Sequence, residues 1–273
     1  MELLEFDFMR RALFATVCMA VLCPLIGIFL VLRRTAMTGD ALAHSTLAGV
    51  TLGLAGGVNP VGASFVFTAA AALLIEVLRH YFQSFTDLVL TIVLALSVGL
   101  AITLISSGAV HANAESFLFG SLLTVTQTDL WVIGGLTGAA LVLGGIFYHE
   151  ILATAFDEEA ARAAGVPVRL TACLFAVLTA SAVASAVRIS GVLVMSSMLT
   201  VPVATALQLR VGFKKTLTAA VLVSLVDALT GLWLSTVVDA APGGVMALTS
   251  TAVLFAAVSW RMLRSRREVA SRF

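Results

Sequence analysis

The chain has 273 residues, of which 60% are hydrophobic and only 11% are charged, and its net charge is +1. A soluble domain carries about 25% charged residues, so this chain cannot cover a surface that faces water. The near-zero net charge gives no indication of nucleic-acid binding. The composition therefore predicts an all-α protein embedded in a lipid bilayer.

Nine apolar runs approach or reach the roughly 20 residues that cross a membrane. In chain order they are Ala12–Leu32, Ala41–Gly57, Pro60–Leu78, Leu88–Ile105, Leu130–Tyr148, Leu170–Val187, Val192–Leu209, Thr216–Val238 and Val245–Trp260. The first run is too long for the core of a signal peptide and reads as a membrane span. The runs predict a polytopic bundle that forms a single domain over residues 1–273.

Two of the nine runs leave the count open. Ala41–Gly57 is short and rich in small residues, and Pro202 predicts a kink within Val192–Leu209. If either run is re-entrant or broken, the bundle has eight spans instead of nine.

Basic residues predict the orientation of the bundle. With nine spans and an extracytoplasmic N-terminus, all of the 16 Lys and Arg residues except Arg10, Arg11 and Arg188 fall on the cytoplasmic side. This distribution follows the positive-inside rule and predicts a cytoplasmic C-terminal tail over residues 261–273.

Small residues inside the spans predict close helix packing, as in "AGVTLGLAGG" and "GGLTGAALVLGG". The three cysteines, Cys18, Cys23 and Cys173, fall in apolar runs without metal-site or disulfide spacing, so we interpret them as small core residues.

Two segments outside the predicted spans carry polar residues. Residues 106–128 form a predicted outer loop with His111 and Glu115, which could receive an incoming ion or simply be solvated. Residues 155–169 form a predicted cytoplasmic segment, in which Asp157 caps a short helix that ends near Gly165. The spacing alone leaves open whether this helix binds a partner or only connects two spans.

Asp40 and His44 are the most informative polar residues of the apolar region. They lie four residues apart, so a helix places both on one face. A carboxylate and a neutral imidazole suit divalent metals such as zinc and manganese, and ionisable groups within spans usually face a pathway or the bundle interior. Alternatively, Asp40 caps the helix and His44 is a buried, hydrogen-bonded histidine.

Other acidic residues have structural interpretations. Glu76 precedes Arg79 and His80 by three and four residues, which predicts an ion pair. Asp129 is expected to cap a span. Asp227 lies in the middle of a span, where it could line a pathway but is better explained by a hydrogen bond to a neighbouring helix.

Four blocks, in order, make the sequence resemble the zinc/manganese-type permeases of the metal-ion ABC-3 family. They are the Gly-Asp-Ala-x-x-His core at Gly39–His44, "SFLFGSLLTVTQTDL" at Ser116–Leu130, "AFDEEAARAAGVPV" at Ala155–Val168 and "SGVLVMSSMLTVPVATALQL" at Ser190–Leu209. The resemblance covers nearly the whole chain. Ala48 departs from the family, where many members carry proline, and this affects helix shape more than metal binding.

The resemblance implies a bacterial inner-membrane permease of an ATP-driven importer, which works as a pair of permease copies. It implies two cytoplasmic ATP-binding subunits and an extracytoplasmic metal-binding protein as partners. It also marks Asp40 and His44 as the residues that meet the metal, which is a transported substrate and not a permanent cofactor. The segment that would contact the ATPase comprises Asp157, Glu158, Glu159, Ala160, Gly165, Val166 and Pro167.

The sequence also bears on rival functions. It contains no Walker A pattern, so the chain is not expected to hydrolyse ATP itself, and it has no His-Glu-x-x-His or G-x-S-x-G motif of a hydrolase. A secondary metal transporter, which often shows repeated halves, and a permease for a siderophore or cobalamin remain alternatives. Among metals, the ligands favour zinc first and manganese second.

Overall fold

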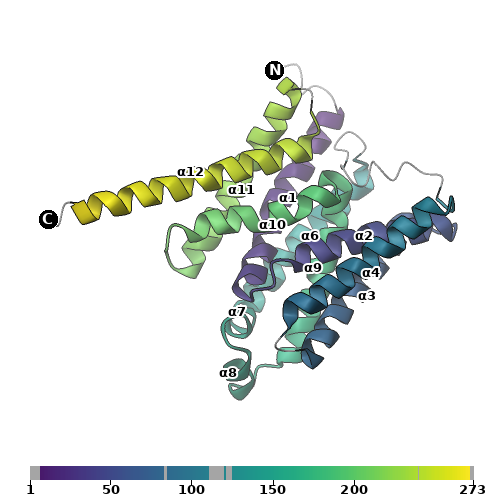
Figure 1. Cartoon of the computed structure of the whole chain (residues 1–273), viewed down its shortest axis with the longest axis horizontal. Coiled ribbons are helices and arrows are strands. Elements are labelled where there is room, and N and C mark those ends of the chain that lie inside the picture. The colour runs from purple at the N-terminus through teal and green to yellow at the C-terminus, as the bar shows by residue number, and fades with distance from the viewer. Residues whose placement is uncertain (1–6, 83–84, 111–119, 121–124, 239, 271–273) are drawn as a thin grey trace.

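A computed structural model of the chain describes residues 7–82, 85–110, 120, 125–238 and 240–270. The regular structure of this part is helical, as predicted. With the labels of Figure 1, the helices are α1 (Asp7–Leu32), α2 (Thr38–Ala55), α3 (Pro60–Tyr81), α4 (Thr86–Ser106), α6 (Gln127–Ile146), α7 (Tyr148–Phe156), α8 (Glu158–Ala163), α9 (Val168–Ser190), α10 (Val192–Leu207), α11 (Phe213–Val238) and α12 (Pro242–Ala270).

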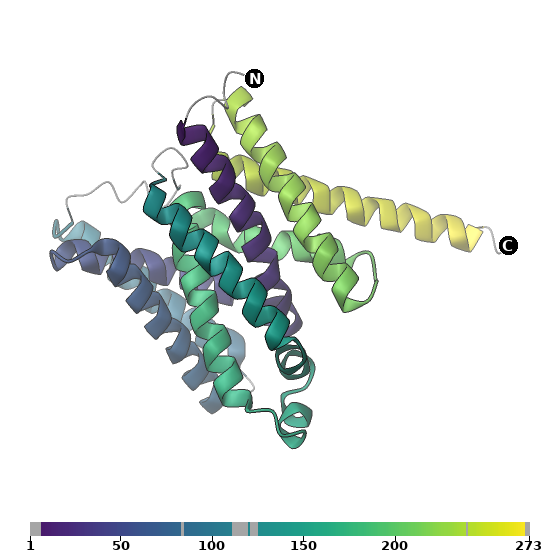
Figure 2. The same cartoon turned by 180° about the vertical axis from the view of Figure 1, so that it is seen from behind.

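The helices form a bundle in which α1 and α2 occupy central positions. α1 packs against α6, α10 and α11, whereas α2 packs against α3, α4, α9 and α10. α12 packs along α10 and α11, and its C-terminal part projects beyond the other helices in both views (Figure 1 and Figure 2). α7 and α8 lie together at one end of the bundle, beyond the ends of α1 and α6.

The predicted count of nine spans is not confirmed. In the described part of the chain, seven helices are long and apolar enough to cross a membrane, namely α1, α3, α4, α6, α9, α11 and α12. The two remaining predicted spans correspond to α2 and α10, the runs whose status the sequence left open. α10 has 16 residues, about 24 Å at 1.5 Å per residue, which is shorter than the roughly 30 Å hydrocarbon core. The hydropathy of α2 is lowered by Asp40, His44 and several hydroxyl and glycine residues.

Local sequence explains where several helices begin and end. The Asn59 side chain accepts hydrogen bonds from the first turn of α3, and Pro60 occupies the first helical position, where no amide donor is needed. Thr126 and Asp129 form a capping box at the start of α6, which confirms the predicted cap. Gly191, with φ of +86°, separates α9 from α10, in agreement with the break predicted between these runs.

The interior contains many small and hydroxyl residues together with large apolar side chains such as Leu22 and Ile133, while other large apolar side chains face outward. Cys18 and Cys23 are buried, as predicted, whereas Cys173 is partly exposed and does not belong to the core. Trp131, Trp233 and Trp260 are exposed, as expected for a surface in contact with lipid. Buried hydroxyls commonly donate to a carbonyl one turn earlier, for example Thr179 to Phe175 at 2.8 Å. Such bonds satisfy polar groups where no water is available.

Candidate metal-binding site

Asp40 and His44 lie one turn apart near the start of α2 and point to the same side, as predicted. His44 Nε2 is 4.0 Å from Asp40 Oδ1, and the two side chains are 22% and 27% exposed. The distance is too long for a hydrogen bond. Two ligand atoms of a tetrahedral zinc ion, each about 2.0–2.2 Å from the metal, lie roughly 3.4 Å apart, so one ion can contact both atoms after a small side-chain rotation.

The alternative role of Asp40 as a helix cap is not what the structure shows. The residue that caps α2 is Met37, which makes no side-chain hydrogen bond to the helix. Asp40 lies inside the first turn, where the positive end of the helix dipole favours a carboxylate. The carboxylate of Asp40 is therefore not used to cap the helix.

Most of α2 is buried, so the partial exposure of Asp40 and His44 distinguishes them from their neighbours. From Ala41 to Thr51, His44 alone keeps partial exposure. The opposite side of the helix is bonded to the bundle. Ser45 Oγ lies 2.8 Å from Ser97 Oγ of α4, and Thr46 Oγ1 lies 3.0 Å from Thr68 Oγ1 of α3.

Glycines bring α2 into backbone contact with α3. A Cβ atom added at Gly49 would lie 2.7 Å from Ser64 Cα, and one added at Gly53 would lie 2.7 Å from Pro60 Cα. This small-xxx-small spacing allows the close packing that stabilises helix pairs in lipid. This close packing and the hydroxyl pairs of Ser45 and Thr46 fix the rotation of α2 about its axis. The rotation in turn sets the direction in which Asp40 and His44 point.

Leu199 of α10 joins the start of α2 to α1. A Cβ atom at Gly27 would lie 1.9 Å from the Leu199 carbonyl oxygen, and one at Gly39 would lie 2.5 Å from Leu199 Cδ1. The residue next to Asp40 is therefore packed directly on α10. A movement of α10 would therefore displace the start of α2, where Asp40 and His44 lie.

A partly buried ion cluster holds the segment that leads into α2. Glu76 accepts from Arg79 at 3.0 Å, which confirms the predicted pair, and also from Arg33 at 3.2 Å. The second bond was not predicted, because Arg33 and Glu76 are 43 positions apart and no helical spacing relates them. The cluster ties the end of α1 to the end of α3.

Removing the negative charge of this cluster is expected to destabilise the bundle. Glu76→Gln should weaken both arginine contacts and lower the free energy of unfolding by roughly 2 kcal/mol, because a hydrogen bond to a charged group contributes about 1.5–3 kcal/mol. Thermal melting in detergent measures the change. Glu158→Gln is the matched control, since its 3.5 Å pair with Arg162 is about half exposed on both sides and should contribute less than about 1 kcal/mol. Equal melting of the two variants would contradict the role of Glu76.

The other predicted site residues are not gathered around the pair. Asp227 is fully buried in α11, close to Ser250 of α12. Neither of its carboxylate oxygens has a hydrogen-bond partner among the described residues, so the side-chain hydrogen bond predicted to a neighbouring helix is not present. Among the described residues no group of three or more His, Cys, Asp and Glu side chains is placed to hold a metal, so Asp227 does not join Asp40 and His44. His111 and Glu115 lie outside the described residues, and their role stays a prediction.

The predicted cytoplasmic segment contains α8, a short helix at the end of the bundle (Figure 1). The Asp157 carboxylate accepts a hydrogen bond from the Ala160 amide at 2.9 Å, which confirms the predicted cap. Gly165 adopts a φ of +87° just after the helix, and Ala161 is the buried residue of α8. The helix is small, rigidly capped and exposed on most of its surface.

A second ion pair lies near the start of α6, and it was not predicted. Arg188, near the end of α9, donates to Asp129, the residue that also forms the capping box of α6. The two residues are 59 positions apart, so no spacing rule connects them. The bond fixes the end of α9 directly before the break at Gly191.

The comparisons with known proteins agree with this architecture. Residues 5–261 match the model of the ABC 3 transport family. The chain is 48% identical over 257 residues to a probable metal transport system membrane protein of Treponema pallidum, covering 94% of this chain and 97% of that protein. It is 31% identical to the manganese transport system membrane protein MntC of Listeria innocua, covering 93% and 91%.

Two further relatives extend the comparison. The high-affinity zinc uptake system membrane protein ZnuB of Haemophilus influenzae is 31% identical, with 87% of this chain and 92% of that protein covered. Among solved structures, PsaBC from Streptococcus pneumoniae in complex with Fab superposes with a TM-score of 0.82 at 27% identity, covering 93% and 92% of the two chains. The family match over nearly the full length, with these relatives, shows that the chain belongs to the ABC 3 transport family of membrane permeases.

Proposed function

We propose that the chain is the membrane-spanning permease of an ATP-driven importer that moves divalent metal ions into the cytoplasm. The observation that carries the proposal is the Asp40–His44 pair, partly exposed on an otherwise buried helix with its ligand atoms 4.0 Å apart. The family supports the transport role. Relatives named for manganese and for zinc are equally similar, so the proposal keeps zinc first, on ligand chemistry, and manganese second.

A divalent ion crosses the bilayer only if protein groups replace its hydration shell. Asp40 supplies negative charge, and His44 supplies a nitrogen of intermediate softness. One carboxylate and one imidazole are few ligands for a metal site, and this suits a site that has to release its ion. Two permease copies related by a two-fold axis would present two such pairs, which together make a transient site with two nitrogens and two oxygens.

The energy for transport is proposed to come from two cytoplasmic ATP-binding subunits. The segment from Asp157 to Pro167, with the capped helix α8 at the end of the bundle, offers them a compact surface.

An extracytoplasmic metal-binding protein would deliver the ion at the loop of residues 106–128. The distribution of Lys and Arg supports this orientation, with α8 on the cytoplasmic side.

Uptake by cells tests the function. A bacterial strain without its own high-affinity zinc and manganese importers should accumulate metal when it expresses this chain together with its ATP-binding and metal-binding partners. Accumulation is measured by mass spectrometry of washed cells supplied with each metal separately. Uptake should stop when the ATP-binding subunit is made inactive at its Walker A lysine. Uptake that continues without an active ATPase would identify a secondary transporter instead.

A further inference from the structure

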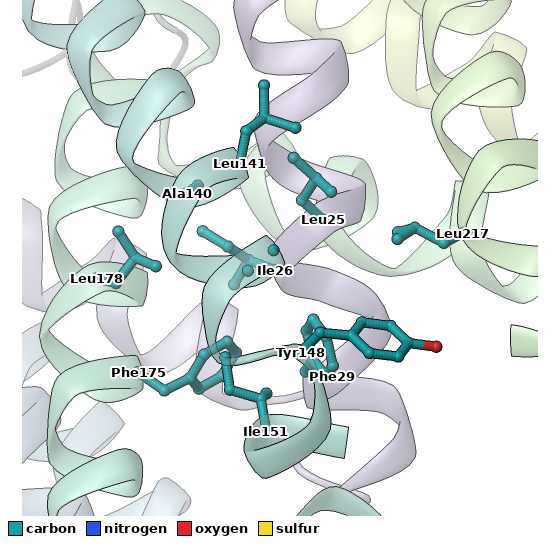
Figure 3. Close-up of a pocket in the computed structure, with 12 residues that line it drawn as sticks. Leu25, Ile26, Phe29, Ala140, Leu141, Tyr148, Ile151, Phe175, Leu178 and Leu217 are labelled. Carbon is teal, nitrogen blue, oxygen red and sulfur yellow. The ribbon is translucent and has the colours of Figure 1, made fainter. Parts of the chain in front are cut away.

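A cavity of about 220 Å³ opens between α1, α6, α7, α9 and α11 (Figure 3), and neither Asp40 nor His44 lines it. Its walls are apolar and come from Leu25, Ile26, Leu141, Leu178 and Leu217, among others. Gly144 and Gly145 of α6 also line it, and a Cβ atom at either glycine would meet no other atom within 4 Å. The glycines therefore leave free space beside the cavity instead of serving a helix contact.

Three aromatic rings line this cavity, those of Phe29, Tyr148 and Phe175, and the ring of Phe213 packs against two of them. Phe29 lies 5.7 Å from Phe175 and 5.6 Å from Phe213, measured between ring centroids, and Tyr148 lies 5.6 Å from Phe213. In Figure 3 the Tyr148 ring extends toward the side of Leu217, and its hydroxyl points away from the cluster around Phe175. Tyr148 thus marks the boundary between the apolar cavity and a polar neighbourhood.

That neighbourhood is a basic hollow at the start of α11. It is lined by Tyr148, Val211–Phe213, Lys214 and Lys215. Lys214 Nζ lies 5.5 Å from the centre of the Tyr148 ring, which is within cation–π distance. In the part of the chain that the structure describes, neither lysine pairs with a carboxylate. Both charges are exposed and available to an anion.

We propose that the cavity and the hollow form one binding site for an anionic phospholipid of the cytoplasmic leaflet. One acyl chain would occupy the apolar cavity, and the phosphate would lie beside Lys214 and Lys215. The order along α11 fits this arrangement, because the lysines precede Leu217, the residue that lines the cavity, by less than one turn. Water gains little in an apolar space, whereas basic pockets between membrane helices on the cytoplasmic side bind lipid headgroups. Neither Asp40 nor His44 lines the site, so it does not depend on the proposed substrate; its place in the cytoplasmic leaflet rests on the orientation of the proposed function.

Photo-crosslinking of lipid tests the site. The full-length chain is reconstituted in nanodiscs that contain photoreactive phosphatidylglycerol, with the reactive group on the acyl chain, and labelled peptides are identified by mass spectrometry. Label should appear on the cavity-lining segments of α1, α6 and α11. Photoreactive phosphatidylcholine at the same concentration should label these segments about tenfold less, because two lysines favour an anionic headgroup. Equal labelling by both lipids would overturn the proposed headgroup contact.

Matched variants separate this site from general contact with lipid. Gly144→Leu fills the cavity and should remove the label, whereas Gly138→Leu, on the same helix and also without an atom within 4 Å of an added Cβ, should keep it. The double variant Lys214→Gln/Lys215→Gln should reduce phosphatidylglycerol labelling by about tenfold, and Arg162→Gln should not change it. Wild-type labelling in Gly144→Leu would overturn the proposal. If Gly144→Leu does not fold, the double lysine variant tests the proposal, and unchanged phosphatidylglycerol labelling in that variant would overturn it.

Discussion

Replacing Asp40 or His44 by alanine will sharply reduce metal uptake while the protein remains in the membrane at its normal level. Each change removes one of the two ligands proposed on α2, and removal even of a group that only supports a ligand costs about 10–100-fold. We therefore expect the initial rate of uptake to fall at least about tenfold in each variant. The uptake rate of Asp40→Asn, a variant that keeps the shape of the side chain and loses its charge, should fall as well. The measurement is initial metal uptake by cells, normalised to permease content in isolated membranes.

Two variants serve as controls for this experiment. His149→Ala removes an imidazole from α7, where it is exposed and outside any group of ligands, and should transport normally. Glu115→Ala in the outer loop should leave uptake mostly intact. If Asp40→Ala and His44→Ala both transport at the normal rate, the metal pathway lies elsewhere. If Glu115→Ala loses transport, the outer loop takes part in ion transfer.

Gly27→Ala is the second change with a large expected effect, and it acts on folding. The added methyl group would lie 1.9 Å from the Leu199 carbonyl oxygen, and a backbone atom cannot move aside by changing rotamer. Overpacking in a core costs about 1–3 kcal/mol, and this contact should reach the upper end of that range. Fluorescence-detected size exclusion should show loss of the monodisperse peak. Gly135→Ala, with nothing within 4 Å of the new atom, is the control.

The neighbouring contact at Gly39 allows a rescue experiment. Its added methyl group would meet Leu199 Cδ1 at 2.5 Å, which is the end of a flexible side chain. Shortening that side chain with Leu199→Ala should therefore restore Gly39→Ala and should not restore Gly27→Ala. Rescue of both variants, or of neither, would contradict the contacts that place α10 against α1 and α2.

Local features of the fold were predictable because they depend on neighbouring residues. Asp157 and Asp129 cap helices as expected, and Gly191 breaks the chain where predicted. The predicted runs also match the helices closely, for example Leu88–Ile105 within α4. The number of membrane spans was harder to predict. Hydropathy alone does not decide whether a helix that is short, like α10, or less apolar, like α2, crosses the membrane.

Contacts between distant segments could not be predicted. The bonds of Arg33 to Glu76 and of Arg188 to Asp129 join residues that no helical spacing relates. The same holds for the candidate site. Helix geometry placed Asp40 and His44 on one face, and the family resemblance suggested their role. Their partial exposure, however, depends on how α3, α4 and α10 cover the rest of α2, and this is a property of tertiary packing.

The burial of Asp227 has a consequence for biogenesis. An aspartate at the centre of a helix costs about 2.5–3.5 kcal/mol during insertion by the translocon, and Asp227 lies near the middle of α11. Its polar neighbours come from α12, where Ser250 faces the side chain and the Thr249 hydroxyl donates to the Asp227 carbonyl at 3.3 Å. Helix α11 is therefore expected to leave the translocon together with α12, as a hairpin, so that truncation before Pro242 should strand α11 outside the bilayer.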